Sequence, residues 1–476
     1  MSENKNAPGS GFNTVYGPPL TAEPVGPSAP PPESGYNSAA YNTQYGAAAA
    51  PAAPPPSYNS VVSPQQHAFS ISYADFLPDM TEEGGVFSSA KYERFDIVVS
   101  KANAWLRSQP HVRVSCCETL ETKLRYGNID TQKSTYYERG ESNQRYARSL
   151  RVWVVSKDQN ASPEPDQIGY KNLIPLCTDG GGIFGKPKFE TFGETIDRFN
   201  ETQRMQPVGK IINIETQEMK FSSYKENGID PDKTSWLEYG ENSQYYLFVV
   251  RVFYQLGQPA HEQVCCADFY PQQTNTEELF SQPRFEPFSS VAQQARNWLA
   301  GQYSVSLINV QSINYKIQSW TGEIDTQRSL FLEHGESTTK FIRILRVCVS
   351  KPFNQEAGLV PAPQLLNYKV FYPALLRMST FGSGDWETQA DTMKRAMAWF
   401  ALTGMTPISC ETIQIKSCGS EGPNAENCYT RHRGDSNYIW LYVLRLYFVG
   451  DPVEPDPSLL PPVPVPQGND DCCNIL

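Results

Sequence analysis

The sequence predicts an α+β protein with four tandem internal repeats of about 95–100 residues, each formed by a strand, a helix and three further strands, between disordered Pro-rich tails. The first observation is a glycine followed by an acidic residue, which precedes an arginine by eleven positions four times along the chain. The second is an aromatic-glutamate pair upstream of each glycine, with a lysine between pair and glycine. This constant spacing indicates repeated structural units.

These landmarks define a repeat framework of four positions in each unit. The positions are Glu93, Lys123, Gly140 and Arg151; Glu190, Lys220, Gly240 and Arg251; Glu286, Lys316, Gly335 and Arg346; and Glu387, Lys416, Gly434 and Arg445. We expect the charged members to form ion pairs within each module, because an enzyme seldom needs four copies of one site.

The elements of one unit follow from hydrophobic periodicity. A short apolar run such as Tyr368–Tyr372 predicts the first strand. After the aromatic-glutamate pair, apolar residues recur at steps of three and four, as at Val291, Ala295 and Leu299, which predicts an amphipathic helix. The alternating segment Ile211–Lys220 is typical of a second strand.

The residues on both sides of each framework glycine predict a β-hairpin. The return strand is strongly apolar, as in Val250–Tyr254, and the glycine supplies the turn geometry at low steric cost. Units of this length can each form a core, so both four separate beads and a closed four-part ring are open.

Composition divides the chain into six segments. They are a disordered arm rich in Pro, Ala and Tyr (1–67), four repeats (68–163, 164–259, 260–362 and 363–450), and a Pro-rich spacer with a C-terminal motif (451–476). As polyproline II, the spacer would hold the body several tens of ångströms from a membrane, at roughly 3.1 Å per residue.

Charge and hydropathy exclude several classes of protein. The net charge is −11 and no Lys/Arg run occurs, so the sequence predicts no nucleic-acid binding. It also predicts neither a signal peptide nor a spanning helix, because apolar stretches of about 18 residues are missing. The eleven cysteines are an odd number without a disulfide pattern, which favours reduced thiols in the cytosol.

The last four residues, Cys473-Asn474-Ile475-Leu476, match a prenylation motif, and the terminal leucine favours a geranylgeranyl group on Cys473. Cys472 is a candidate for a second, acyl anchor. The acidic residues just upstream disfavour electrostatic attachment. We therefore expect membrane attachment through lipid, on the cytoplasmic face of the plasma membrane or an endomembrane.

The N-terminal arm contains Pro55-Pro56-Ser57-Tyr58, a PPxY motif of the kind that WW domains bind. Pro55, Pro56 and Tyr58 are the residues that such a domain would contact. Low-complexity composition is the alternative explanation for this tetrapeptide.

The sequence predicts neither an enzyme nor a cofactor or metal site. Cys410, Cys418, Cys428 and His432 have a spacing that no standard zinc site shows, and buried apolar roles explain the cysteines more simply. No nucleophile with a neighbouring base can be assembled from the five histidines.

The leading hypothesis is a lipid-anchored scaffold or adaptor that displays four α+β modules at a membrane and recruits partners through its PPxY-bearing arm. One alternative is a repeat protein that binds or converts a small ligand, which a pocket lined by charges found in one unit only would favour. A second alternative is a structural coat protein that self-associates.

Overall fold

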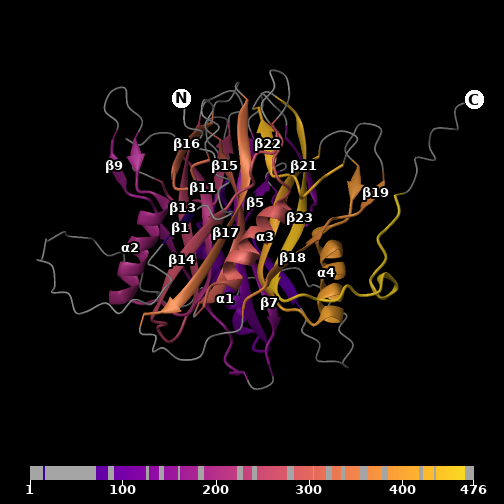
Figure 1. Ribbon diagram of the computed structural model, residues 1–476, viewed down its shortest axis with the longest axis horizontal. Helices are drawn as coiled ribbons and strands as arrows, with labels where there is room; N and C mark the ends of the chain where they lie inside the picture. Colours follow the sequence, from indigo (N-terminus) through magenta and orange to yellow (C-terminus); the bar gives the residue numbers. More distant parts are fainter. Residues whose placement is uncertain are drawn as a thin grey trace, which may run out of the picture. The chain divides into compact units, whose positions relative to one another are not determined.

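A computed structural model describes residues 14–16, 71–83, 90–124, 128–138, 144–158, 161–180, 187–221, 229–238, 244–275, 283–303, 305–317, 324–333, 338–353, 363–377, 384–417, 422–433 and 436–466. The fold is mixed α+β, with mostly strands and, in this part of the chain, four α-helices (Figure 1). The four large sheets are arranged like the blades of a four-bladed propeller, so the repeats form a ring and not separate beads.

Each blade is an antiparallel sheet around one long apolar strand that ends the repeat. These central strands are β7 (Gln144–Ser156), β13 (Gln244–Gln255), β17 (Thr339–Pro352) and β23 (Tyr438–Val449). Their near-continuous burial explains their apolar sequence, because both faces of the sheet are covered.

Two further strands of the same repeat lie on either side of each central strand. The outer strands are β2 (Ile71–Phe76), β8 (Ile168–Leu173), β14 (Glu262–Phe269) and β18 (Leu366–Phe371). The inner strands are β5 (Val112–Lys123), β11 (Ile211–Phe221), β15 (Ser306–Lys316) and β21 (Pro407–Ser417). We number the blades 1 to 4 in chain order.

A short strand from the next repeat completes each blade. These strands are β6 (Thr135–Glu138), β12 (Ser235–Glu238), β16 (Leu330–Glu333) and β22 (Tyr429–His432). β12 pairs with β7, β16 with β13, β22 with β17 and β6 with β23. The last pairing joins the first repeat to the fourth, so the ring is closed.

The expected hairpins at the framework glycines are therefore wrong as strand pairings. The short strand before each glycine extends the neighbouring blade instead of folding back onto its own return strand. The physical reason is that β2, β8, β14 and β18 already cover the outer part of each central strand, and the neighbour's short strand fills the remaining part of the same edge. Gly140, Gly240, Gly335 and Gly434 themselves lie outside the described residues.

The four helices are α1 (Phe95–Arg107), α2 (Phe192–Met205), α3 (Phe288–Ala300) and α4 (Gln389–Thr403). Each packs between sheets of neighbouring blades. The core around α4 contains Trp399 and Phe400 together with Ile71 and Trp153 of blade 1. Because each such core is shared, one blade cannot bury its apolar surface without the next.

Small two-stranded sheets lie beside three of the helices. They pair β3 (Met80–Glu82) with β4 (Lys91–Tyr92), β9 (Cys177–Asp179) with β10 (Lys188–Phe189), and β19 (Leu375–Arg377) with β20 (Asp385–Trp386). In blade 3 an isolated bridge between Gln273 and Phe285 takes this place. No described helix has the length and apolarity needed to cross a bilayer.

Both tails contribute ordered segments where the sequence predicted none. β1 (Thr14–Tyr16) pairs antiparallel with the free edge of β14 in blade 3. Residues 451–466, which we call the strap, continue from blade 4 along the body and include one turn of 3-10 helix, Pro457–Leu459. Asp451 forms two hydrogen bonds of 2.8 and 2.6 Å with Arg296, and Leu460 packs against the core around α4.

Glu454 also fixes the strap to blade 4. Its carboxylate accepts hydrogen bonds from Lys369 Nζ at 2.7 Å and Trp399 Nε1 at 3.0 Å. These contacts hold a segment whose proline content alone indicated a free spacer. The spacer prediction is therefore wrong for residues 451–466, because polar and apolar contacts together fix them to the body.

Candidate functional site

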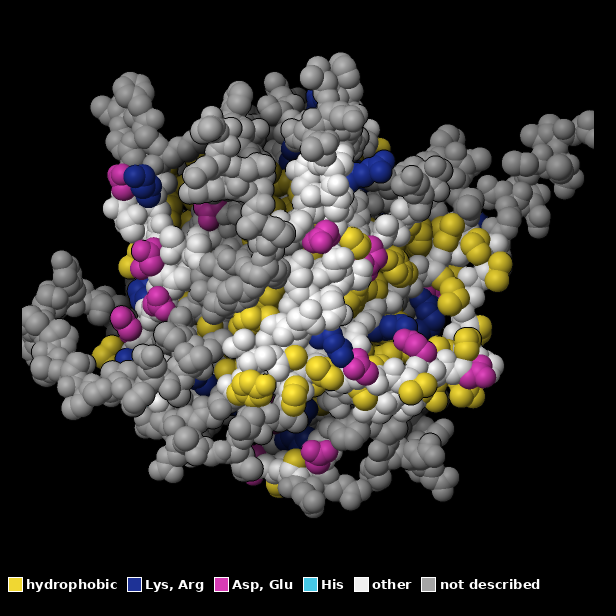
Figure 2. Space-filling model, viewed as in Figure 1, with side chains coloured by type: hydrophobic (Ala, Val, Ile, Leu, Met, Phe, Trp, Pro, Cys, Tyr) yellow, Lys and Arg dark blue, Asp and Glu magenta, His cyan; other side chains and the backbone are white. Residues whose placement is uncertain are grey.

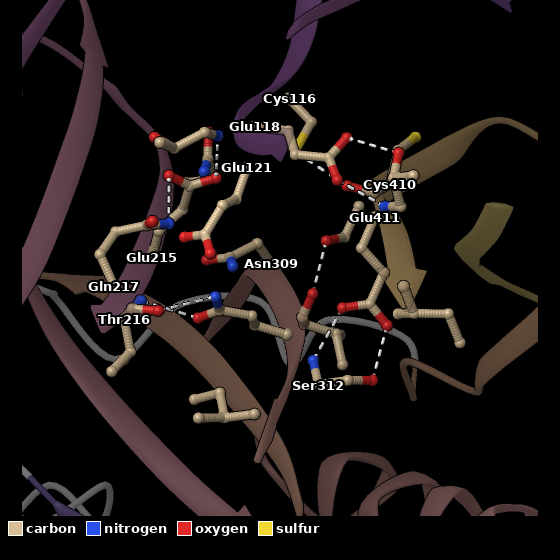
Figure 3. Close-up of a pocket in the computed structure, with 18 of the residues that line it drawn as sticks. Cys116, Glu118, Glu121, Glu215, Thr216, Gln217, Asn309, Ser312, Cys410 and Glu411 are labelled. Carbon is tan, nitrogen blue, oxygen red and sulfur yellow. Dashed lines mark hydrogen bonds between the residues drawn. The ribbon is translucent and has the colours of Figure 1, made fainter. Parts of the chain in front are cut away.

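The inner strands of the four blades lie side by side around the propeller axis, where they enclose a polar cavity of about 260 Å³ (Figure 3). Side chains, and not a backbone ladder, join these strands wherever the structure describes them. The lining contains Glu118, Glu215, Gln311 and Glu411, one from each blade. Each of the four precedes the Thr or Ser of its repeat.

These four residues bind the backbone of the preceding blade. Glu215 accepts from Thr119 N at 3.0 Å, Gln311 from Thr216 N at 2.8 Å and Glu411 from Ser312 N at 2.8 Å. Glu118 accepts from Thr412 N at 2.5 Å and closes the ring. Glu118, Glu215 and Glu411 therefore have structural partners, as buried polar groups require.

A second layer of side chains lies two positions earlier in each inner strand. Asn213 bridges both backbone groups of Cys117, and Asn309 bridges both of Ile214. Ser409 donates to Val310 O at 2.7 Å, and Cys116 Sγ lies 3.8 Å from Cys410 O. The axis is thus held by two stacked rings of hydrogen bonds between blades.

The framework arginines are fully buried in the central strands and reach across the blade boundaries. Arg151, Arg251 and Arg346 donate from Nη1 to Thr412, Thr119 and Thr216 at 2.8–3.0 Å, and Arg445 donates to Ser312 at 2.9 Å. Three of them also lie over the first helical residue of the preceding blade, as Arg346 does over Phe192 at 3.4 Å. In blade 4 this residue is Gln389, and Arg151 lies over Tyr73 instead.

The arginines differ in their charge partners. Arg151 and Arg346 form bidentate ion pairs with Asp75 and Asp268 on the outer strands, at 2.7–2.8 Å. In blade 2 Asn172 takes the place of the aspartate and accepts from Arg251 at 2.8 Å. Arg445 lies 3.7 Å from Glu411 of its own blade. The expected charge pairing within modules is therefore found for three of the four arginines, and Arg251 lacks it among the described residues because Asn172 stands in place of the aspartate.

The framework lysines extend from the inner strands to the short strands of their own repeats. Lys220 donates to Leu237 O at 2.5 Å and Lys416 to Arg431 O at 2.9 Å, and Lys123 and Lys316 donate to Tyr137 O and Leu332 O. Each acceptor is the third residue of a four-residue short strand. The lysines therefore hold the strands that pass into the preceding blade of the ring.

The framework glutamates brace the helices from outside the axis. Glu93 and Glu387 bind Lys101 and Arg395, eight positions later, at 2.5 Å, and Glu190 binds Arg198 at 2.8 Å. Glu286 makes the equivalent contact with neutral Gln294 at 3.3 Å. Each of the four also accepts a backbone N–H from 13 or 14 residues earlier. All four are structural side chains.

His432 joins three repeats at the ends of the short strands. Its ring nitrogens lie 2.8 Å from Glu333 and 2.9 Å from Glu138. Although burial opposes the charge, these two carboxylates raise the pKa of His432 to about 11, while His432 lowers the pKa of Glu138 against its own burial. At the equivalent position in repeat 2, burial and nearby acids raise the pKa of Glu238 to about 7.

The described cysteines that line the axial cavity are not activated as nucleophiles. Burial raises the pKa of the Cys116, Cys117 and Cys410 thiols well above the ordinary range, so the reactive thiolate is disfavoured. Burial likewise raises the pKa of Glu215 to about 7. The described His, Cys, Asp and Glu side chains form no cluster of three or more suited to a metal ion.

The sequence-predicted lipidation and partner sites lie outside the described residues. These are Cys472 and Cys473 at the C-terminus, and Pro55, Pro56 and Tyr58 in the arm. Of the rejected zinc ligands, Cys418 is also outside, while Cys410 and Cys428 are buried.

Sequence reasoning missed the role at the axis of one recurring pair of polar residues, Glu118-Thr119, Glu215-Thr216, Gln311-Ser312 and Glu411-Thr412. Their recurrence in all four units was the available signal, but the contact between repeats appears only when the ring is closed. No protein-family model matches this chain, and no curated protein and no solved structure is significantly similar to it.

Proposed function

We propose that this protein is a rigid, lipid-anchored platform that is held at the cytoplasmic face of a membrane and recruits WW-domain partners. The proposal rests on the structural role of the polar residues that recur in the four repeats. The framework arginines, lysines and glutamates hold blades and helices together, so function is assigned to the tails. The platform role follows from the closed ring, in which no blade is complete alone.

Because the strap is bound to the body, a lipid anchor on Cys473 would leave only a short distance between the body and the membrane. Pro466 is its last described residue, and seven positions separate it from Cys473. An extended chain of that length spans at most about 25 Å. A prenyl group on Cys473 would therefore keep blade 4, to which the strap is bound, close to the bilayer.

The exposed side chains of the strap agree with a membrane-facing position. Val453 and Val465 are 89% and 84% exposed, and Leu459 and Val463 are each 63% exposed. Figure 2 shows hydrophobic side chains gathered at the right, on the side of α4 in Figure 1. Apolar side chains beside a lipid anchor can add to its weak individual affinity.

The proposed partner motif lies between two ordered strands. Pro55–Tyr58 falls between β1, which is paired with blade 3, and β2 of blade 1. A WW domain would thus bind a segment that continues along the chain, in both directions, into strands of the body. Recruitment would tether that partner to the ring and, through the proposed lipid anchor, to the membrane.

Partition of the full-length protein between membrane and soluble cell fractions tests the anchor. We expect the wild type with membranes, Cys473→Ser in the soluble fraction, and Cys472→Ser divided between the two. Identical partition of wild type and Cys473→Ser contradicts the anchoring proposal. A melting curve of each purified variant confirms that the ring is intact.

Capture by WW domains tests the arm separately. The full chain should be retained, while Tyr58→Ala should be lost because the tyrosine ring fills the aromatic groove. Tyr45→Ala, in the same arm but outside the motif, is the matched control. Equal retention of the Tyr58 and Tyr45 variants removes the recruitment claim while leaving the anchor claim standing.

A further inference from the structure

A second cavity, of about 460 Å³, lies where blade 3 meets the short strand β22 of repeat 4. None of its described lining residues belongs to the tails, and it shares one lining residue, Arg343, with the axial cavity. Its charged lining residues are Arg343, Lys416, Arg431 and Arg433. No Asp or Glu is found among its described lining residues, although the whole chain carries a net charge of −11.

The basic character of this cavity is not a property of every repeat. Arg431 is the third residue of β22, and the same position in the other short strands holds Tyr137, Leu237 and Leu332. Lys416 is a framework lysine, so its charge alone is common to all four units. The additional charge on β22 makes the pocket specific to this part of the ring.

Arg343 is the deepest of these cations, with 6% of its surface exposed. Its Nε donates to Asn314 Oδ1 at 3.3 Å and its Nη2 to Gln414 O at 2.8 Å. Nη1 donates to none of the described residues, and Glu411, the carboxylate that acts on Arg343 electrostatically, lies beyond ion-pair distance. The equivalent Arg148 of blade 1, by contrast, has Glu121 at 3.6 Å.

Burial of the Arg343 guanidinium costs folding free energy when no anion lies beside it. Burial, together with the nearby Arg445, lowers the pKa of Arg343 to about 10. A buried cation normally requires an opposite charge, as Asp268 provides for Arg346. A bound anion in the cavity would supply that charge and would also meet Lys416 and Arg431.

The uncharged part of the lining indicates more than a simple ion. Thr430, Asn424 and Asn427 are polar, and Tyr429 and Tyr438 add aromatic side chains, with Lys416 Nζ 3.5 Å from the centroid of the Tyr438 ring. The volume falls in the range of small-molecule sites, about 300–1,000 Å³, and exceeds what one phosphate fills. Hydroxyl groups and phosphate groups on one ligand would match this mixture of donors.

We propose that this pocket binds a phosphorylated polyol, either as a free metabolite or as the headgroup of a phosphoinositide lipid. The guanidinium groups of Arg343 and Arg431 would bind phosphate oxygens, for which a forked donor is well suited. Lys416 would add a point charge. The inference does not depend on lipidation or on the PPxY motif.

Titration calorimetry with inositol trisphosphate tests the site, using full-length Cys473→Ser protein at constant ionic strength. We expect saturable binding that weakens at least about tenfold in Arg431→Ser, as loss of a charge-assisted contact predicts. Arg343→Gln should weaken it as well. Arg113→Ser is the matched control, because Arg113 is an exposed strand arginine of blade 1 and does not line the pocket.

Vesicle sedimentation distinguishes the two sources of the ligand. Binding to phosphatidylcholine vesicles that contain a phosphoinositide, but not to those with phosphatidylserine, would assign the lipid headgroup if Arg431→Ser abolishes it. Binding of inositol trisphosphate without vesicle binding would assign a free ligand. Failure of the wild type to bind either probe overturns the proposal, and so does an equal loss in Arg113→Ser. Because Arg431 is exposed, its substitution should leave the melting temperature unchanged.

Discussion

Arg151 Nη1 donates a hydrogen bond of 3.0 Å to Thr412 Oγ1, across 261 residues of sequence. This contact joins blade 1 to blade 4, and equivalent contacts join each of the three remaining pairs of neighbouring blades. The same Thr412 also donates its backbone N–H to Glu118. One residue of repeat 4 therefore takes part in two of the interactions that close the ring.

Removal of the Thr412 hydroxyl should destabilise the whole ring. Thr412→Val keeps the shape but leaves Arg151 Nη1 buried without this acceptor, so we expect a loss of about 1–3 kcal/mol in the free energy of unfolding. Thr412→Ser keeps the hydroxyl and should lose less. Urea unfolding followed by tryptophan fluorescence measures the difference, and equal stability of the two variants would contradict a closing role.

Asp268 should be more tolerant of asparagine than of alanine. Asp268→Ala leaves Arg346 buried without its bidentate carboxylate, which should cost about 3–5 kcal/mol. Asp268→Asn should cost clearly less, because Asn172 already accepts from Arg251 in blade 2. Chemical denaturation of the two variants compares them, and an equal cost would show that the carbonyl oxygen contributes little.

His432 should stabilise the protein most at mildly acidic pH. Its pKa is raised to about 11 in the folded chain from an ordinary value of 6.5, so the folded state retains the proton more strongly. The contribution is complete below the ordinary pKa and is lost as pH rises through the folded one. The pKa of Glu138 is lowered in the folded chain, so its contribution to stability has the opposite pH dependence. That contribution is present above the ordinary pKa of 4.5 and is lost as the pH falls below it.

Comparison of wild type with His432→Gln measures this effect. The wild type should be more stable by the largest margin at about pH 6, and the margin should shrink by about pH 10. Denaturant unfolding at both values gives the two margins. A margin that is constant or grows with pH would mean that the imidazolium does not pair with Glu138 and Glu333.

The cysteines should differ sharply in their reaction with a thiol reagent. Among the described cysteines Cys177 is exposed, while the buried ones are Cys116, Cys117, Cys265, Cys266, Cys348, Cys410 and Cys428. Native alkylation followed by peptide mass spectrometry should modify Cys177 at least tenfold faster than these, because burial blocks access and disfavours thiolate. Modification of Cys116 or Cys410 at the rate of Cys177 would mean that the axial cavity opens readily.

Several features of the fold could be predicted from the chain because they are local and recur. The four helices follow from steps of three and four apolar residues, and the inner and central strands from their apolar patterns. The recurrence of Lys123 and Arg151 with their counterparts marked residues that hold the framework. The sequence could not show which blade each of these side chains contacts, because the spacing within one repeat is the same whether a side chain binds its own blade or a neighbouring one.

The number of repeats, their α+β composition and the motifs of the two tails could be derived from the chain alone, because these features depend on residues that are close in sequence. The tertiary structure decided that the short strands are exchanged between blades, that Glu118 meets Thr412, and that the strap is bound to blade 4. It also brought Arg343 to the cavity beside β22. The physical reason is that ring closure brings together groups hundreds of residues apart, and burial then requires each polar group to find its partner there.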